Sequence, residues 1–435
     1  QGEEEVRVHG HVIVVGGGSG GCAVAGRLAE AGYSVCLLEA GGRDWNPWIH
    51  IPVGYFKTIH NPGVDWCYKT EPDPGLNGRS IEWPRGKVLG GSSSLNGLLY
   101  VRGQPQDYDR WRQMGNRGWG WEDVLPLFKR AENNERGADA HHGDDGPLSV
   151  SDMRIQRPIT DAWVAAAQTA GYRFNPDYNG AEQEGVGYFQ LTSRNGRRCS
   201  AAVAYLNPVK TRDNLQIITH AHVERLMIED RRAVGVVYTD KSGASQVIKA
   251  HREIILSGGS INSPQVLMHS GIGEPAQLAE HGIGTIQNLP GVGKNLQDHL
   301  QARLVYKCNE PTLNNEVSSL FGQARIGLKY LLSRSGPMTM AASLATGFLK
   351  TRKDLETPDI QFHVQPLSAE NPGKGADKFA AFTMSVCQLR PESKGEIWLG
   401  GADPKAYPRI IPNYLSTETD CRTIVNGVNI ARKIA

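Results

Sequence analysis

The sequence predicts a two-domain protein of mixed α and β structure, in which a parallel α/β domain is joined to an α+β domain with an antiparallel sheet. A glycine-rich turn between a strand-like and a helix-like segment near the start predicts the first domain. Strand-like segments near the carboxyl end predict the second domain. With 435 residues, the chain is also longer than one simple core usually supports.

The first unit has the order strand, turn, helix and strand, at residues 11–15, 16–21, 22–31 and 34–39. This order is typical of a βαβ motif. The polar residues 1–7 are left out of the fold prediction. From residue 41 to 103 no period is sustained, over a length far beyond that of an ordinary connection. Such long irregular segments generally bind something.

The remaining chain is predicted to hold several helices and strands. Helical spacing occurs at 121–133, 158–170, 263–269, 275–281 and 418–435. Residues 215–257 read as successive strands, which predicts a small β-meander, and a helix started by Pro264 is expected after Gly258. The strands predicted for a second layer are 360–365, 382–389 and 396–399.

Charge, cysteine content and hydropathy argue against a nucleic-acid partner, a cysteine-based metal site and a membrane span. The 47 basic and 45 acidic residues leave a net charge of +2, and no basic block is dense enough to track a phosphate backbone, so no nucleic-acid partner is expected. The seven cysteines are dispersed without a C-x-x-C pair, which predicts reduced thiols and no metal site. No stretch reads as a membrane span or a signal peptide, which predicts a cytoplasmic protein.

The glycine-rich turn has the spacing of a dinucleotide-binding fingerprint. Gly16, Gly18 and Gly21 follow the pattern G-x-G-x-x-G, where glycines let backbone N–H groups approach a pyrophosphate, and Ser19 lies within the pattern. Glu39 follows Gly21 by 18 residues, at the end of the second strand, where a carboxylate can accept hydrogen bonds from both hydroxyls of a ribose. This spacing does not distinguish FAD from NAD.

The same turn also matches a second class of enzyme. Gly17-x-Ser19-x-Gly21 fits the nucleophile elbow of α/β-hydrolases, which likewise lies between a strand and a helix. A hydrolase elbow normally comes well into the chain, whereas this turn opens the first βαβ unit and Glu39 follows at nucleotide spacing. A serine hydrolase that uses Ser19 therefore stays as the disfavoured alternative.

Two further segments are rich in small residues. Residues 84–97 combine Gly90, Gly91 and several serines with Asn96, so the backbone can lie against a flat or phosphate-bearing ligand. Residues 258–273 begin with glycines that end a strand, and the following helix can offer a second N-terminus to a ligand.

Together, the opening fingerprint, residues 85–96 and residues 259–273 resemble the signature regions of the glucose-methanol-choline (GMC) oxidoreductases. The resemblance covers essentially the whole chain, and it is greatest to bacterial choline-dehydrogenase-like and alcohol-dehydrogenase-like members. Supporting matches are Asp65-Trp66, Gly291-x-Gly293-x-Asn295-Leu-Gln-Asp-His299 and Asp359-Ile-Gln-Phe-His363.

The resemblance implies a Rossmann-like FAD-binding domain at residues 8–155 and 196–300. The substrate-binding domain would take 156–195 and 301–435, with its antiparallel sheet over the flavin. Leu95 stands where some members carry a histidine covalently bonded to the flavin, so noncovalent FAD is expected. The residues expected to bind the cofactor are Gly16, Gly18, Ser19, Gly21, Glu39, Trp66, Arg85, Val88, Gly90, Gly91, Ser92, Asn96, Gly97, Leu98, Val223 and Gly258.

The catalytic residues are not identified in the sequence. The base of the family is a histidine, paired with a second histidine or an asparagine, in a carboxyl-terminal segment that nothing here matches. We therefore expect the catalytic residues, with the end of the family fold, beyond Ala435. His299 and His363 are not assigned as the base, because a histidine in such a turn or strand is more often structural.

The substrate predicted from the resemblance is a primary alcohol, oxidised to an aldehyde by hydride transfer to flavin N5. Choline-acting relatives tend to carry a glutamate where this chain has Gln301, which weakens the case for a quaternary cation. Leu389 replaces the cysteine of the photodecarboxylase branch, and a hydroxynitrile lyase is a further, remote alternative. Choline dehydrogenation proper and flavin binding without turnover stay open, as do the acceptor (a quinone-like compound or oxygen), peripheral membrane association and the oligomeric state.

Overall fold

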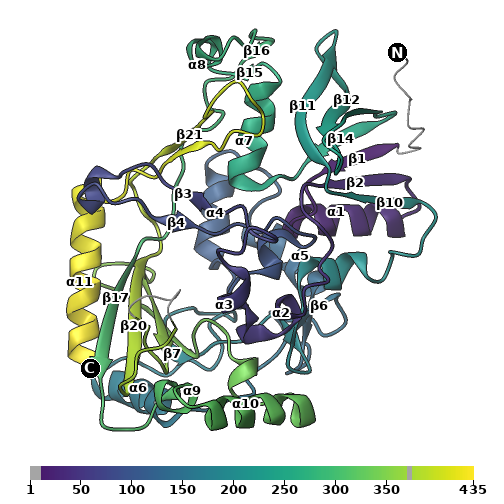
Figure 1. Cartoon of the computed structure of the whole chain (residues 1–435). Helices are drawn as coiled ribbons and strands as arrows, with labels where there is room; N and C mark the ends of the chain where they lie inside the picture. Colours follow the sequence, from purple (N-terminus) through teal and green to yellow (C-terminus); the bar gives the residue numbers. More distant parts are fainter. Residues whose placement is uncertain (1–10, 370–374) are drawn as a thin grey trace.

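The computed structural model describes residues 11–369 and 375–435, and it confirms a mixed α/β architecture with one parallel and one antiparallel main sheet (Figure 1). The polar residues 1–7 lie outside the described residues. The predicted domain boundaries, 8–155 with 196–300 and 156–195 with 301–435, stay a prediction. Within the described ranges, no helix is both long and apolar enough to cross a membrane.

The first main sheet has four parallel strands in the order β10-β2-β1-β14. β1 and β2 are buried along their whole length, because their aliphatic residues face apolar layers on both sides. Helix α1 covers one face with the turn η4, and a three-stranded antiparallel sheet covers the other. The elements are β1 (Val12–Val15), α1 (Ser19–Glu30), β2 (Val35–Glu39), η4 (Ala202–Leu206), β10 (Leu215–Thr219), β11 (His222–Glu229), β12 (Arg232–Thr239), β13 (Ser245–Lys249) and β14 (Glu253–Leu256).

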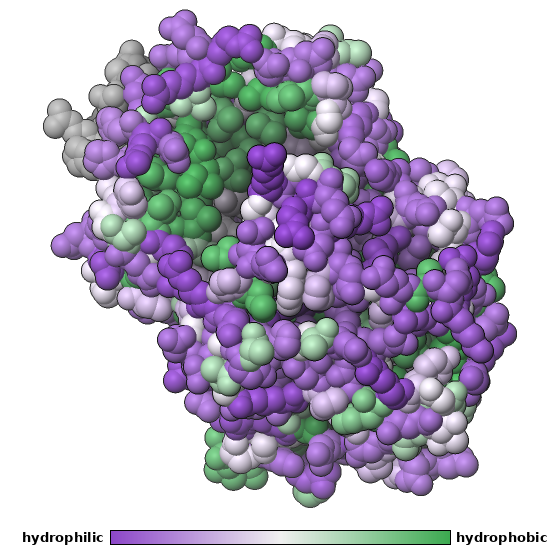
Figure 2. Space-filling model, turned by 180° about the vertical axis from the view of Figure 1, so that it is seen from behind, coloured by the Kyte–Doolittle hydropathy of each residue, from purple (hydrophilic) through white to green (hydrophobic). Residues whose placement is uncertain are grey.

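The predicted meander at 215–257 is only partly correct. The middle strands, β11 to β13, form it, but β10 and β14 pair in parallel with β2 and β1. The apolar side chains of β10 and β14 pack beside the buried strands, so these two strands complete the first sheet instead. Seen from behind, the surface of this part of the molecule is hollowed and apolar beside the grey amino-terminal segment (Figure 2).

The irregular segment 41–103 crosses between the two sheets as a series of short elements. Asp65, which is buried, fixes its shape: its carboxylate accepts hydrogen bonds from the backbone N–H groups of His60, Cys67 and Arg85. The elements are α2 (Pro47–His50), η1 (Pro52–Gly54), α3 (Tyr55–Thr58), β3 (Tyr68–Lys69), η2 (Pro74–Leu76), β4 (Glu82–Trp83) and η3 (Gly91–Ser94).

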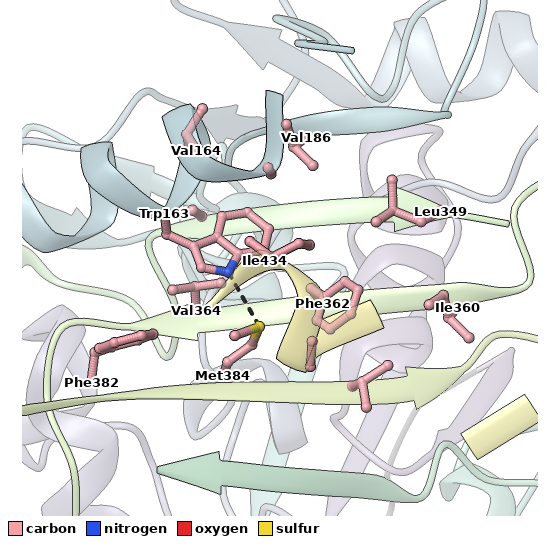
Figure 3. Packing of buried hydrophobic residues seen from close by; sticks show 14 residues of the cluster. Trp163, Val164, Val186, Leu349, Ile360, Phe362, Val364, Phe382, Met384 and Ile434 are labelled. Atoms are coloured by element: carbon pink, nitrogen blue, oxygen red, sulfur yellow. Dashed lines mark hydrogen bonds between the residues drawn. The ribbon is translucent and has the colours of Figure 1, made fainter. Parts of the chain in front are cut away.

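The second main sheet is antiparallel, with the strand order β17-β20-β19-β18-β7. One face packs against helices α6 and α11, where Trp163 donates its indole N–H toward the sulfur of Met384 at 3.2 Å (Figure 3). The elements are α6 (Pro158–Thr169), β7 (Gly185–Tyr188), β17 (Gln301–Lys307), β18 (Ala345–Leu349), β19 (Ile360–Gln365), β20 (Ala381–Gln388) and α11 (Glu418–Ile434).

Alternation along β19 gives this sheet two different faces. Ile360, Phe362 and Val364 point into the helix-covered core, so Gln361 and His363 lie on the opposite, polar face. The strand predicted at 396–399 does not join this layer; β21 pairs with β22 in a separate two-stranded sheet.

The remaining elements surround the two sheets. Helix α7 begins at Gly259 rather than at Pro264, which lies inside the helix and removes one backbone donor from it. These elements are α4 (Pro105–Gln113), α5 (Trp121–Ala131), β5 (Glu132–Asn134), β6 (Leu148–Val150), β8 (Ser193–Arg194), β9 (Arg197–Arg198), α7 (Gly259–His269), β15 (Ile272–Gly273), α8 (Pro275–Glu280), β16 (Gln287–Asn288), α9 (Leu313–Val317), α10 (Leu320–Ser333), η5 (Pro337–Thr339), β21 (Glu396–Trp398) and β22 (Arg409–Ile411).

A buried ionic network ties the segment after α5 to the loop before β7. Arg102 donates to the Glu132 carboxylate at 2.6 Å, and the two ring nitrogens of His142 lie 3.0 Å from carboxylate oxygens of Glu132 and Asp177. Burial opposes a charge on His142, but hydrogen bonds to Asp177 and Glu132 outweigh it and raise the pKa of the imidazole to about 9. Asp139, His142 and Asp177 could together hold a metal ion, yet both His142 nitrogens already face carboxylates, so we assign these residues to the network.

Phe362→Ala should remove a large part of the core beneath the second sheet. Phe362 is 0% exposed, so its loss should lower the free energy of unfolding by about 3–5 kcal/mol. The matched control is Phe321→Ala on α10, where the side chain is 81% exposed and the change should stay within about 0.5 kcal/mol. Denaturant unfolding followed by circular dichroism measures both, and equal losses would contradict this packing.

The His142 network should make stability depend on pH. Because the folded pKa of about 9 exceeds the ordinary value of 6.5, the stabilisation is fully present below pH 6.5 and is lost as pH rises through 9. The loss should reach up to about 3 kcal/mol, an order-of-magnitude value. Melting temperatures measured across this window should fall more steeply for the native protein than for His142→Gln. Parallel pH profiles of the two proteins would exclude a charged His142.

Candidate functional site

A cavity of about 330 Å³ lies at the carboxyl end of the first sheet. It is bounded by the turn between β1 and α1, the end of β2, the beginning of α7 and the irregular segment 66–92. In open parallel sheets, ligands bind at this edge, where the turns leave the sheet in opposite directions. The position of the cavity is therefore that of a nucleotide site.

The turn between β1 and α1 presents bare backbone to the cavity. Gly16 has a φ of 98° and lies so close to the next strand that a Cβ there would be 2.6 Å from the Ser257 carbonyl oxygen. Gly18 and Gly20 face open space, with no atom closer than 3.9 Å to a Cβ built on Gly18. Because no side chain caps α1, its first N–H groups are free to meet an anion.

Glu39 stands at the end of β2 beside this turn. Its carboxylate accepts hydrogen bonds from the backbone N–H groups of Gly17, at 2.8 Å, and Gly41, at 2.7 Å. Burial raises the pKa of Glu39 to about 7, although these two bonds and the charge of Lys87 act in the opposite direction. The carboxylate lines the cavity, and further hydrogen-bond donors there would stabilise its charged form.

Aromatic and cationic side chains form the opposite wall. The Trp66 ring stacks on Tyr68 with a centroid distance of 5.6 Å, and the Lys87 ammonium lies 4.5 Å from the Trp66 ring centroid. Arg85 lines the cavity next to Trp66. A flat ligand with negative groups would meet the Trp66 ring and the Arg85 guanidinium on this wall.

The sequence prediction identified only one of the residues that line the cavity at the second helix N-terminus. Gly258 was expected in the site, but Ser257, Gly259, Ser260 and Asn262 also line the cavity. The helix signal was placed too far along the chain, because Pro264 suggested a helix start. His222 and His269, which also line the cavity, lack a sequence signal; burial lowers the pKa of both imidazoles.

The structure divides the expected cofactor-binding residues into three groups. Those that line the first cavity are Gly16, Gly18, Ser19, Glu39, Trp66, Arg85, Gly91, Ser92, Val223 and Gly258. Asn96, Gly97 and Leu98 line a second cavity instead. Gly21, Val88 and Gly90 line neither: a Cβ on Gly21 would be 1.8 Å from the Gly16 carbonyl oxygen, Val88 is fully buried, and Gly90 donates to the Gly17 carbonyl.

The second cavity, of about 270 Å³, lies between residues 96–99 and the polar face of the second sheet. Gln301, Ser343, His363 and Gln365 supply its polar wall, and the lining holds no carboxylate. The first and second cavities follow one another along residues 91–98. A ligand that extends from the first cavity along this segment would reach the second sheet.

His363 is the distinctive group of this wall. Among the described residues, its buried Nδ1 atom has no hydrogen-bond partner, and its ring stacks on Phe189 at a centroid distance of 5.7 Å. Burial, with a smaller contribution from His299, lowers the pKa of His363 to about 4, so the imidazole is neutral. The cavity wall at His363 therefore carries a neutral ring.

Arg198 is a positioning residue that the sequence did not reveal. It is buried, and its guanidinium donates to the backbone oxygen of Asn96 and to the Asn96 side-chain oxygen, both at 2.8 Å. These bonds hold the segment between the two cavities. Arg198 lies about 100 residues away along the chain, so no local pattern pairs it with Asn96.

Two other predicted residues have different surroundings. The imidazole of His299 lies 2.9 Å from the Leu389 carbonyl oxygen, a contact between two loops. Ser19 is exposed at the start of α1, and within the described part of the chain its hydroxyl has no hydrogen bond to a histidine. The arrangement required for a serine nucleophile is not present around Ser19.

Comparison with known proteins gives consistent matches. A family model described as GMC oxidoreductase matches residues 11–301, and a second model of that family matches residues 391–435. The chain is 43% identical to an alcohol dehydrogenase [acceptor] of Pseudomonas putida, over 97% of this chain and 77% of that protein. It is 42% identical to human mitochondrial choline dehydrogenase, over 97% of this chain and 72% of that protein.

Solved structures show the same fold. Pyridoxine 4-oxidase from Mesorbium loti superposes with a TM-score of 0.86 at 30% identity, covering 97% of this chain and 80% of that one. A formate oxidase of Aspergillus oryzae RIB40, studied for modification of its FAD, superposes with a TM-score of 0.89 at 26% identity, covering 98% and 80%.

Proposed function

Because the chain belongs to the GMC oxidoreductase family, we propose that it binds FAD without a covalent bond and oxidises a neutral primary alcohol to the aldehyde. The family and the named relatives support FAD-dependent oxidation of alcohols. The observation that carries the proposal is that the two cavities lie along one short segment, residues 91–98, so that a dinucleotide site is followed by a polar, uncharged wall.

The residues of the first cavity fit the adenosine and pyrophosphate parts of FAD. The bare backbone at Gly18 and Gly20 leaves room for the pyrophosphate, and the Glu39 carboxylate is placed to accept from a ribose diol. The Val223 backbone lies on the wall where an adenine would be held. When bound, the flavin supplies the acceptor for the hydride of the alcohol carbon.

Noncovalent attachment is supported by the surroundings of Leu95. This side chain is buried in an apolar cluster with Ile49, Val64 and Val88. Leucine offers no nucleophile to a flavin ring, and the cluster places no histidine or cysteine at that position. The segment is instead held by Arg198 through Asn96.

The second cavity would orient the alcohol against the flavin. His363 would orient the hydroxyl from its place on this wall, and the side-chain amides of Gln301 and Gln365 can donate or accept hydrogen bonds there. With a pKa of about 4, His363 is a weak base, so we assign it to positioning rather than to removal of the hydroxyl proton. We assign no described residue as that base.

Choline is the competing substrate, since the choline dehydrogenases are relatives at similar identity. The lining of the second cavity argues against it, because no carboxylate there could offset a trimethylammonium charge. A flavin-binding chain without turnover is the other alternative. The electron acceptor, a quinone-like compound or oxygen, stays a proposal, as does the compartment.

Glu39→Gln should weaken FAD binding about 10–100-fold, because two charge-assisted hydrogen bonds to the ribose become neutral ones. In the native protein, affinity should also fall as pH is lowered through 7, where Glu39 takes up a proton, and this dependence should disappear in the variant. Flavin fluorescence titration of the apoprotein measures both effects. Glu30→Gln, at the exposed end of α1, is the matched control.

An equal loss of affinity in both variants, or a pH dependence kept by Glu39→Gln, would contradict a role for Glu39 in holding the ribose. Melting curves of the two apoproteins separate a binding defect from misfolding.

His363→Ala should lower kcat/KM for a straight-chain primary alcohol about tenfold or more, with an unchanged flavin absorbance spectrum. His363→Gln should restore part of the loss, and the exposed His251→Ala should have no effect. The measurement is anaerobic bleaching of the FAD-loaded protein with the alcohol and, separately, with choline. Faster bleaching by choline would contradict the proposal of a neutral alcohol as substrate. Flavin binding without bleaching by either compound would favour a chain that binds the flavin without turnover.

A further inference from the structure

Helix α10 is attached to the rest of the protein along a narrow face. Only Gly322 and Tyr330 of its residues are buried, and Ile326 lies between them on the same face, because the three are spaced by four positions. Tyr330 donates its hydroxyl to the Gly196 carbonyl at 3.0 Å, which fixes α10 against the β8–β9 hairpin. The opposite face of α10 is exposed in the described part of the protein.

That opposite face is apolar. Its largest exposed side chains are those of Leu320, 85% exposed, and Phe321, 81% exposed, and Leu328, Leu331 and Leu332 are 58–78% exposed. With 3.6 residues per turn, these positions and Ala324 form one stripe about 120° wide, directly opposite Ile326. We call these six residues the α10 stripe. A helix of a globular protein normally buries such a stripe against the core, whereas α10 turns it outward.

Cations flank one edge of the α10 stripe, and α10 itself carries no acidic side chain. Arg325 and Lys329 lie along its edge on the helix itself, and Arg334 ends the helix. Arg194 and Arg197 are exposed on the hairpin to which Tyr330 is bound, and Arg154 contacts the same hairpin through Asn195. The carboxylate of Glu316, before α10, is paired with Arg157 and Arg325.

We propose that α10 is a membrane-docking helix that lies in the interface of an anionic phospholipid bilayer, with the α10 stripe among the acyl chains and the flanking cations Arg325 and Lys329 on the headgroups. An apolar stripe bordered by Lys and Arg is the pattern of helices that lie in a membrane surface. A second copy of this chain would fit less well, because its own cations would meet those of the first.

The docking surface has a direct connection to the substrate cavity. After α10, the short turn η5 leads to Ala342 and Ser343, which line the cavity of about 270 Å³. Apolar atoms reach the surface at the end of the molecule where Figure 1 places α10 (Figures 1 and 2). Docking would bring this side of the cavity close to compounds dissolved in the membrane. The docking itself does not depend on the proposed activity.

The experiment is sedimentation of the whole protein with vesicles of phosphatidylcholine, with and without phosphatidylglycerol. The native protein should bind vesicles that contain phosphatidylglycerol, and binding should fall as salt is raised. Phe321→Asp with Leu331→Asp should reduce binding at least about tenfold, since two apolar groups leave the acyl chains. Arg325→Gln with Lys329→Gln should reduce it about tenfold and weaken the salt dependence.

The matched control is Leu127→Asp, an exposed leucine on α5 that is 59% exposed. It should leave vesicle binding unchanged, and melting curves of all variants should match that of the native protein. Absent vesicle binding, equal losses in the control, or a self-association of the native protein that the Phe321 and Leu331 changes abolish would each overturn the proposal.

Discussion

The close approach of α1 to the end of β1 is the constraint on which the rest of the site depends. A side chain on Gly21 would collide with the Gly16 carbonyl, so the helix can start directly behind the sheet edge only with glycine there. That approach places the Gly17 N–H on the Glu39 carboxylate and the Gly17 carbonyl under the N–H of Gly90. The contact between α1 and the end of β1 therefore determines where the nucleotide cavity and the segment 90–98 lie.

Beyond this contact, residues 91–98 run from the nucleotide site to the second sheet. Residues 91–92 line the first cavity and residues 96–98 line the second, with Arg198 holding Asn96 between them. The sheet supplies the opposite wall because alternation along β19 sends Phe362 into the core and His363 the other way. The packing that stabilises the second domain thus also orients its polar wall.

The polar wall and the α10 stripe show the two environments that a membrane-soluble alcohol would meet. The wall is uncharged, and burial keeps His363 neutral. No charge therefore has to be desolvated when an apolar alcohol enters, and the main cost in free energy is the loss of the alcohol's own hydration. The α10 stripe is an apolar surface at the end of the same stretch of chain. In this arrangement, residues 320–343 join the surface proposed for docking to the site proposed for the substrate.

The sequence by itself determined the βαβ opening, the spacing from Gly16 to Glu39 and the family, because these depend on local periodicity and on residues close together in the chain. Of the segment 85–98 that it singled out, Arg85, Gly91, Ser92 and residues 96–98 line the two cavities, and their contact with the cofactor stays a prediction. Only the tertiary structure decided that β10 and β14 join the first sheet and that β21 leaves the second. It likewise paired Arg198 with Asn96, left the nitrogen of His363 unpaired and turned the α10 stripe outward. These outcomes depend on which distant surfaces pack together, and no period or spacing within one segment records that choice.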